Sequence, residues 1–164
     1  MTLDELRATL EQLTQGPVVA TGAVRHVYLW HGDLEELIRI VPPALRRDLD
    51  LYALARQIPR APYAIDEAQR TLRTHIEQAL REQIAHSPHQ VLLVSGCSLL
   101  ARYRVPIQPF YAFASDRRVV ILVVSRQDSE FTPDDSLPEF VHLDQTAVLT
   151  ALSQAVGQQC VVQG

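Results

Sequence analysis

Four residues that could take part in catalysis lie in loops after apolar segments of the sequence: His31, Asp33, Cys97 and Asp128. Imidazole, thiolate and carboxylate groups supply many of the nucleophiles, general bases and metal ligands of enzymes. In open parallel sheets, ligands bind beyond the carboxyl ends of the strands. If the apolar segments are parallel strands, the three loops that carry these residues lie along one edge. The sequence therefore offers a strand-end site as one place for chemistry.

A metal site at this edge would use His31 and Asp33, with His26 or Asp128 as further ligands, but their spacing is unspecific. Asp33 has a structural explanation, because Asp33 and Glu36 fit a D-x-x-E capping box at the start of a helix. His26 has one as well, on the solvent-facing polar side of a strand. We expect no bound metal and no cofactor.

Cys97 could act as a nucleophile, because the N-terminus of a following helix lowers the pKa of a thiol. The sequence assigns it no histidine partner, and a small, half-buried structural cysteine is the commoner case. Cys160 lies far away in the sequence, so we expect two free thiols, as suits a reducing compartment. The carboxylates of residues 128–135 lack a catalytic spacing, and an acidic, proline-containing surface loop explains them equally well.

Phosphate binding by backbone N–H groups needs closely spaced glycines, and the phosphate-loop form also needs a lysine. The six glycines include no G-x-G pair, and all fifteen basic residues are arginine. The loop WHGDLEE places three acidic residues where a phosphate would bind. ATP or GTP hydrolysis is therefore disfavoured, and covalent catalysis by lysine is excluded.

The composition is that of a folded globular domain: 164 residues, of which 47% are hydrophobic and 21% charged. No apolar run approaches the roughly 20 residues of a membrane span, and the acidic, amphipathic start is unlike a signal peptide. We therefore expect a single cytoplasmic domain. The net charge of −4 does not favour direct binding of nucleic acid.

Predicted strands and helices alternate along the chain. The apolar runs 91–94 and 119–124 indicate central parallel strands that are covered on both faces. Further predicted strands are 27–30, 48–51, 140–143 and 161–162, and predicted helices are 4–13, 34–41, 52–58, 66–85, 110–114 and 146–156. This order predicts a three-layer α/β domain, a mostly parallel sheet of about five strands with helices on both faces. It would be a degenerate form of a phosphate-loop or Rossmann-type sheet.

The segment from Ala101 to Phe113 favours protein binding. Interfaces are enriched in arginine and aromatic residues, and prolines stiffen a loop so that docking costs less entropy. The predicted contact residues are Arg102, Tyr103, Arg104, Phe110 and Tyr111. In the structural alternative, Phe110 and Phe113 pack beneath the sheet while the arginines are solvated.

This central segment resembles the small accessory proteins of BREX phage-defence systems, the BrxB-like and BrxF-like families. The likeness covers about residues 49–124 and rests on LYALA before a long helix and on VLLVSGCSLLARYRVPIQPFYAFASDRRVVILVV. BrxF-like proteins resemble phosphate-loop ATPases, and this chain lacks their glycine-rich loop and lysine. The BrxB-like side implies a partner of larger defence proteins, such as the alkaline-phosphatase-like PglZ.

We therefore expect a non-catalytic adaptor in a defence complex, which binds a larger protein through the region of residues 102–113. The alternative is a small hydrolase or metal-dependent enzyme at the strand ends. A deep polar pocket that joins His31, Cys97 and Asp128 would favour the enzyme, whereas a filled edge would favour the adaptor.

Overall fold

The computed structural model describes residues 1–19, 25–58, 64–126, 137 and 140–164. Its five strands form one sheet in the order β2-β3-β4-β1-β5, and every pairing in it is parallel. The strands are β1 (Val27–Gly32), β2 (Arg46–Asp50), β3 (Gln90–Ser95), β4 (Arg118–Ser125) and β5 (Val161–Gln163). The predicted α/β fold class is confirmed. The strand order differs from the 3-2-1-4-5 order of dinucleotide-binding domains.

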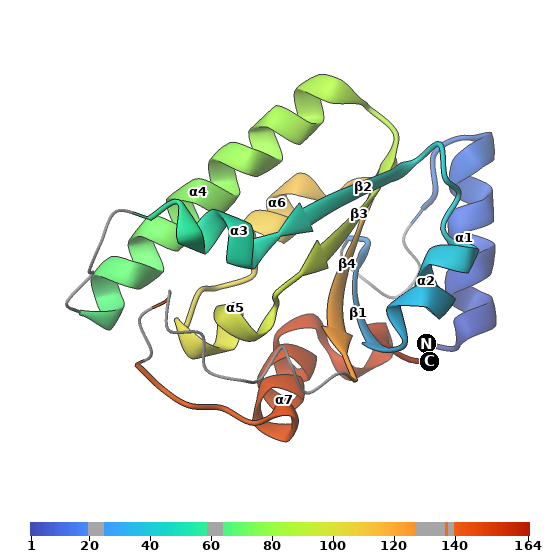
Figure 1. The fold of residues 1–164 in the computed structure, drawn as a ribbon. Helices are drawn as coiled ribbons and strands as arrows, with labels where there is room; N and C mark the ends of the chain where they lie inside the picture. The colour runs from blue at the N-terminus through green and yellow to red at the C-terminus, as the bar shows by residue number, and fades with distance from the viewer. Residues whose placement is uncertain (20–24, 59–63, 127–136, 138–139) are drawn as a thin grey trace.

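Helices cover both faces of this sheet, as Figure 1 shows. α1 and α2 lie on one side, and α4, α6 and α7 lie on the other. The bounds are α1 (Leu3–Gln15), α2 (Leu34–Ile40), α3 (Leu51–Arg56), α4 (Ile65–His86), α5 (Ser98–Arg102), α6 (Gln108–Phe113) and α7 (Gln145–Val156), with a 3-10 turn at Gln158–Cys160. No described helix is both long and apolar enough to cross a membrane.

Aspartate side chains start three of the helices by accepting hydrogen bonds from free backbone N–H groups. Asp33 accepts from Glu35 N at 2.9 Å, Asp50 from Tyr52 N at 2.9 Å and Asp144 from Ala147 N at 2.8 Å. The predicted aspartate cap at Asp33 is therefore confirmed, but the D-x-x-E capping box with Glu36 is not, because the bond goes to Glu35 N.

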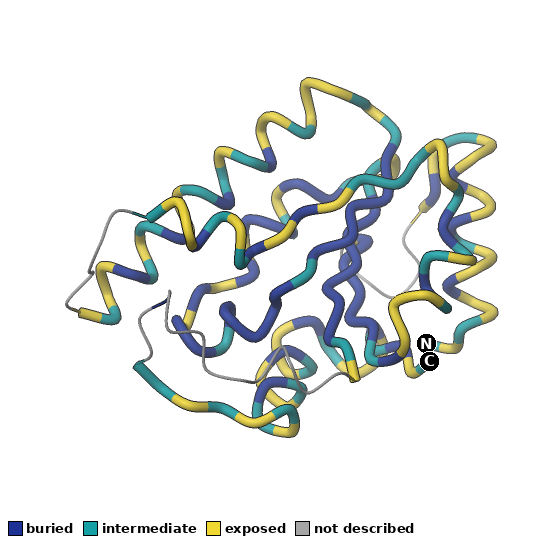
Figure 2. The backbone as a smooth tube through the Cα atoms, in the orientation of Figure 1, coloured by how far each residue is buried: buried dark blue, intermediate teal, exposed yellow. Residues whose placement is uncertain are grey.

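The middle of the sheet is the centre of the hydrophobic core, as the dark blue strands in Figure 2 show. Val91 to Val94 on β3 and Val119 to Val124 on β4 are all buried. Their registers place Leu92 opposite Val120, and Val120 opposite Val27 on β1. Covering by helices on both sides explains why these strands are apolar throughout rather than alternating.

The two edges of the sheet differ from this centre. β2 has the sequence RRDLD, and only Leu49 of its five residues is buried. Arg46 and Asp48 pair on the edge at 3.2 Å. On the opposite edge, β5 is only three residues long.

The predicted strand at residues 140–143 is wrong, because these residues form no strand. Phe140 packs its ring edge-to-face on Tyr103, with 5.6 Å between ring centroids and 75° between planes. The apolar residues that suggest a strand here serve a loop that covers the α5 region.

The helices that follow β1 and β4 lie on opposite faces of the sheet. α2 follows β1 on one face, whereas α7 follows β4 on the other (Figure 1). Because β1 and β4 are neighbours, the topological switch point lies between their carboxyl ends, where open α/β sheets bind ligands. The register brings Gly32 opposite Ser125 there.

Candidate functional site

His31, at the end of β1, makes side-chain contacts at the switch point with two glutamines. Its Nδ1 is 3.4 Å from Gln163 Oε1, and its Nε2 is 3.3 Å from Gln145 Nε2. The Gln145 amide also donates to Ser125 O at 3.0 Å. Because an amide nitrogen only donates, these contacts fit a neutral imidazole with its proton on Nδ1. Both ring nitrogens of His31 are therefore hydrogen-bonded within the protein.

The sequence reasoning missed Gln145 and Gln163. A signal for Gln145 was available, because it begins the helix that follows β4 and returns to β5. In a parallel sheet, such a helix starts at the carboxyl edge. Gln163 lies on the short edge strand that pairs with β1 beside His31.

The other predicted members of the strand-end site do not join His31. Cys97 follows β3, which β4 separates from β1, so about 10 Å lies between the two strands. The Cys97 thiol is fully buried and donates to Val94 O at 3.1 Å. Asp33 is exposed and caps α2. Asp128 lies outside the described residues.

Within the part of the chain that the structure describes, no three His, Cys, Asp or Glu residues cluster as metal ligands. Cys97 and Cys160 are both free, as expected.

The prediction of an accessible protein-binding surface is wrong for three of its five residues, because they are buried. Arg102, Tyr103 and Phe110 are only 3%, 1% and 0% exposed, so a partner could not reach them. α5 and α6 lie against the sheet and its helices and turn these side chains inward. Arg104 is exposed, and Tyr111 is half-buried.

The structural alternative for this segment is right for the phenylalanines and wrong for one arginine. Phe110 and Phe113 are core residues. Arg102 is not solvated, because its Nη1 lies 3.5 Å from the Tyr52 hydroxyl beneath the surface. The Tyr52 hydroxyl also lies 2.8 Å from Ser98 Oγ.

The interpretation of His26 as lying on the solvent-facing side of a strand is wrong, because His26 and the nearby Tyr28 are each only 3% exposed. His26 Nε2 lies 2.9 Å from Val18 O, and its Nδ1 lies 2.6 Å from the Tyr28 hydroxyl. A carbonyl only accepts, so Nε2 carries the proton and Nδ1 accepts from the tyrosine. The pair ties β1 to the segment after α1.

This buried pair predicts a loss of stability in alkali. Burial, with a smaller contribution from nearby Cys160, raises the pKa of Tyr28 to about 12. In the unfolded chain the tyrosine ionises near pH 10, so the folded state binds its proton more tightly. The stabilisation is complete below pH 10, and about 2–3 kcal/mol is lost as pH rises to 12. Urea unfolding across this range measures it.

Tyr28→Phe provides the control, because it removes the titrating group while keeping the ring. Its free energy of unfolding should fall less steeply with pH than that of the wild type. Burial also raises the pKa of Tyr111 and of Cys160, so some decline remains. Equal slopes in both proteins would contradict the role given to Tyr28.

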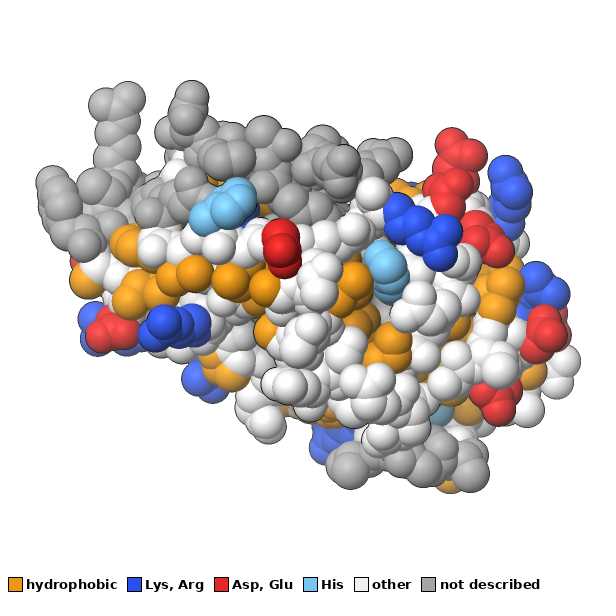
Figure 3. Space-filling view, turned by 90° about the horizontal axis from the view of Figure 1, so that it is seen from below, with side chains coloured by type: hydrophobic (Ala, Val, Ile, Leu, Met, Phe, Trp, Pro, Cys, Tyr) orange, Lys and Arg blue, Asp and Glu red, His pale blue; other side chains and the backbone are white. Residues whose placement is uncertain are grey.

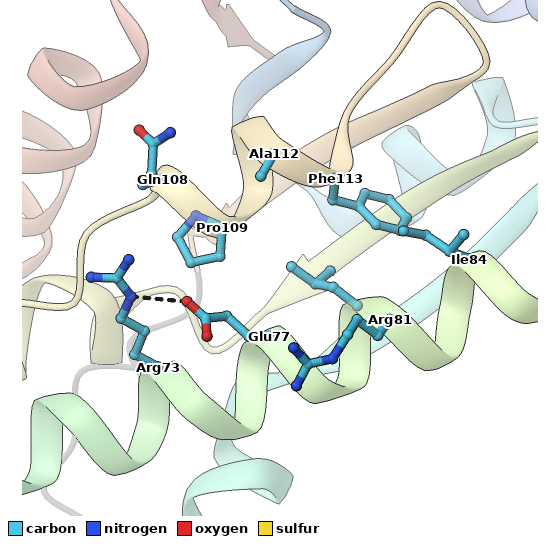
Figure 4. Close-up of a pocket in the computed structure, with 9 residues that line it drawn as sticks. Arg73, Glu77, Arg81, Ile84, Gln108, Pro109, Ala112 and Phe113 are labelled. Carbon is cyan, nitrogen blue, oxygen red and sulfur yellow. Dashed lines mark hydrogen bonds and ion pairs between the residues drawn. The ribbon is translucent and has the colours of Figure 1, made fainter.

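A groove of about 260 Å³ lies on the other side of the molecule from α1 and α2, between α4 and α6 (Figure 4). We call it the α4/α6 groove. Its apolar lining comes from Leu80 and Ile84 on α4 and from Pro109, Ala112 and Phe113 on α6. Ile84 is 43% exposed, although most large aliphatic residues of the described chain are buried. Its polar lining consists of Arg73, Glu77, Arg81 and Gln108.

Two arginines outside α6, Arg25 from far away in the sequence and Arg118 from the strand that follows α6, hold the α6 wall of this groove. The Arg25 Nη1 group lies near three carbonyl oxygens, those of Tyr111, Ala112 and Ala114, at 3.0, 3.3 and 3.1 Å. Arg118 Nε donates to Phe113 O at 2.7 Å. Cations at the carboxyl end of a helix satisfy its free carbonyls and its dipole. The sequence gives no local signal for this, because Arg25 lies 86 residues from Tyr111.

No family model matches the chain, and no curated protein and no solved structure does so either. Its function is therefore inferred from the geometry of the described residues and from their chemistry.

Proposed function

We propose that this protein is a non-catalytic protein-binding component that accepts a segment of a larger partner in the α4/α6 groove. The observation that carries the proposal is a hollow with an apolar lining, at whose end a large aliphatic side chain, Ile84, stays 43% exposed. Exposed apolar surface of this kind, bordered by polar groups, marks interaction sites. Four lining residues, Gln108, Pro109, Ala112 and Phe113, belong to the segment that the sequence favours for binding.

The shape of the groove suits an anchoring side chain of a protein segment. Its volume of about 260 Å³ lies below the roughly 300–1,000 Å³ of typical small-molecule pockets. Its walls are two helices, one of them 22 residues long and the other held at its carboxyl end by Arg25 and Arg118. A preformed groove of this kind loses little entropy when a partner docks.

The arrangement of His31 and Cys97 at the strand-end edge favours the adaptor over the enzyme. Both ring nitrogens of His31 contact glutamine amides of the protein, and Cys97 lies two strands away. His31 and Cys97, which the enzyme would need in one site, therefore lie apart.

The resemblance of residues 49–124 to BrxB-like accessory proteins supports the biological setting of the proposal. It points to a cytoplasmic phage-defence complex, in which the larger partner is a PglZ-like protein.

The substitution Ile84→Asp tests the groove. Affinity purification from the native host, followed by mass spectrometry, identifies the partner, and the purified partner is then titrated onto the wild type and the variant. A carboxylate placed against the apolar lining should weaken binding at least about tenfold, or about 1.4 kcal/mol. The fold should persist, because Ile84 is partly exposed.

Val19→Asp is the matched control, because Val19 is 84% exposed and does not line the groove. It should bind like the wild type. If Ile84→Asp and Val19→Asp bind the purified partner equally well, the groove is not the docking site.

A further inference from the structure

The α4/α6 groove carries a positive charge that its surroundings do not neutralise. Arg73 Nε pairs with Glu77 Oε1 at 3.0 Å, the dashed line in Figure 4, so these two charges offset each other. Arg81 has no carboxylate of the described residues within ion-pair distance. The groove is therefore locally basic, although the chain as a whole has a net charge of −4.

The unpaired charge lies beside the apolar end of the groove. Figure 4 shows Phe113 and Ile84 pointing toward each other, with Arg81 on the neighbouring turn of α4. Arg118 adds positive charge behind this end, because its guanidinium lies 5.2 Å from the centroid of the Phe113 ring. The α6 wall itself, QPFYAF, has no charged residue.

We infer that the groove selects an acidic segment of a partner protein, in which one or two large apolar side chains lie next to a carboxylate. The inference rests on the proposed function, that the groove binds a protein segment. The apolar side chain would contact Ile84 and Phe113, and the carboxylate would pair with Arg81. An apolar lining with a single unpaired arginine fits such a segment better than it fits a phosphate backbone, whose affinity needs several cationic contacts.

A second copy of this chain is the competing occupant. Leu34 on α2 is 38% exposed and stands between the exposed carboxylates of Asp33 and Glu35. Because α2 lies on the opposite side of the sheet from the groove (Figure 1), docking of this segment would join molecules head to tail. A molar mass that grows with concentration, and that Leu34→Asp returns to the monomer, would overturn the choice of a partner protein.

Binding of three labelled amphipathic peptides to the full chain tests the inference. The peptides share leucine and phenylalanine positions and carry glutamate, glutamine or lysine at the others, and fluorescence anisotropy measures their affinities. The glutamate peptide should bind about three- to fivefold tighter than the glutamine peptide at low salt. This advantage should shrink as salt rises, because Arg81 is exposed and its pairing is screened.

The charge reversal Arg81→Glu should invert the order, so that the lysine peptide binds tighter than the glutamate peptide. Arg70→Glu is the matched control, because Arg70 is an exposed arginine of the same helix that does not line the groove. It changes the net charge by the same amount and should leave the order unchanged.

Two failures would be distinguishable. Equal binding of the glutamate and glutamine peptides, abolished for both by Ile84→Asp, would overturn the acidic preference and leave groove docking in place. Binding of the glutamate peptide that Ile84→Asp does not weaken would place the peptide elsewhere and overturn the proposed function as well.

Discussion

Replacing Phe110 with alanine is expected to lower the free energy of unfolding by about 3–5 kcal/mol. Phe110 is 0% exposed and belongs to the hydrophobic core on the inner side of α6. Removing its ring takes away buried apolar contacts and leaves a cavity that close-packed neighbours fill only in part. Urea unfolding followed by circular dichroism measures the loss as a lower midpoint with an unchanged slope.

Tyr111→Phe is the neighbouring control. Tyr111 is half-buried, and its hydroxyl donates to Val156 O at 3.3 Å. The variant keeps the ring and loses one hydrogen bond, so it should cost only about 1 kcal/mol. If Phe110→Ala unfolds at the wild-type midpoint and loses the partner, then Phe110 acts as a surface contact and its inward placement is wrong.

Gly96→Ala is expected to be the second most damaging of these substitutions, at about 2–4 kcal/mol. Gly96 follows β3 and has a φ of +74°, a conformation that residues with a Cβ avoid. A Cβ atom there would lie 2.7 Å from Tyr52 Cδ2 and 3.1 Å from the Tyr52 backbone nitrogen. The tight contact comes in part from backbone, so rotation of one side chain does not relieve it. Thermal unfolding should show the loss directly.

Gly16→Ala provides a comparison that has the cost of a positive φ without the steric contact. Gly16 also has a positive φ, at +153°, but a Cβ atom there would meet nothing within 4 Å. This variant therefore has a conformational cost without a collision and should lose less stability than Gly96→Ala. A loss in Gly96→Ala no larger than about 1–2 kcal/mol, the cost of its positive φ alone, would show that contact with Tyr52 contributes nothing.

The architecture was predictable because its main elements have strong local patterns. The apolar runs of β3 and β4 indicated buried parallel strands, and the repeat of Ala68, Leu72 and Ile76 indicated the long helix α4. Residues 140–143 failed because a short apolar run is ambiguous without knowledge of its neighbours. Phe140 is apolar in order to pack on Tyr103, and a strand and a packed loop have the same composition at this length.

For the candidate site, the sequence could indicate the chain segment but not which of its side chains are exposed. The sequence favoured residues 101–113, and α6 from this segment does form one wall of the groove. It could not show which side chains turn inward, because an arginine such as Arg102 is usually solvated and becomes buried only through distant contacts with Tyr52.

The α4 wall of the groove could not be recognised from the apolar pattern of this helix. Ile84 follows Leu80 in the every-fourth-residue apolar repeat of α4, a spacing that predicts one buried helix face. The structure buries Leu80 and leaves Ile84 at the groove. Hydrophobic spacing identifies the face of a helix but does not show where the surface beneath that face ends.

The charged edge strand limits how this protein can assemble with others. A further strand added beside β2 would bring its backbone against four charged residues out of five, with only Leu49 offering apolar contact. Edges of this kind resist β-augmentation and the growth of intermolecular sheets. Pairing of copies through β2 is thus disfavoured, whereas the α4/α6 groove presents apolar surface between two helices.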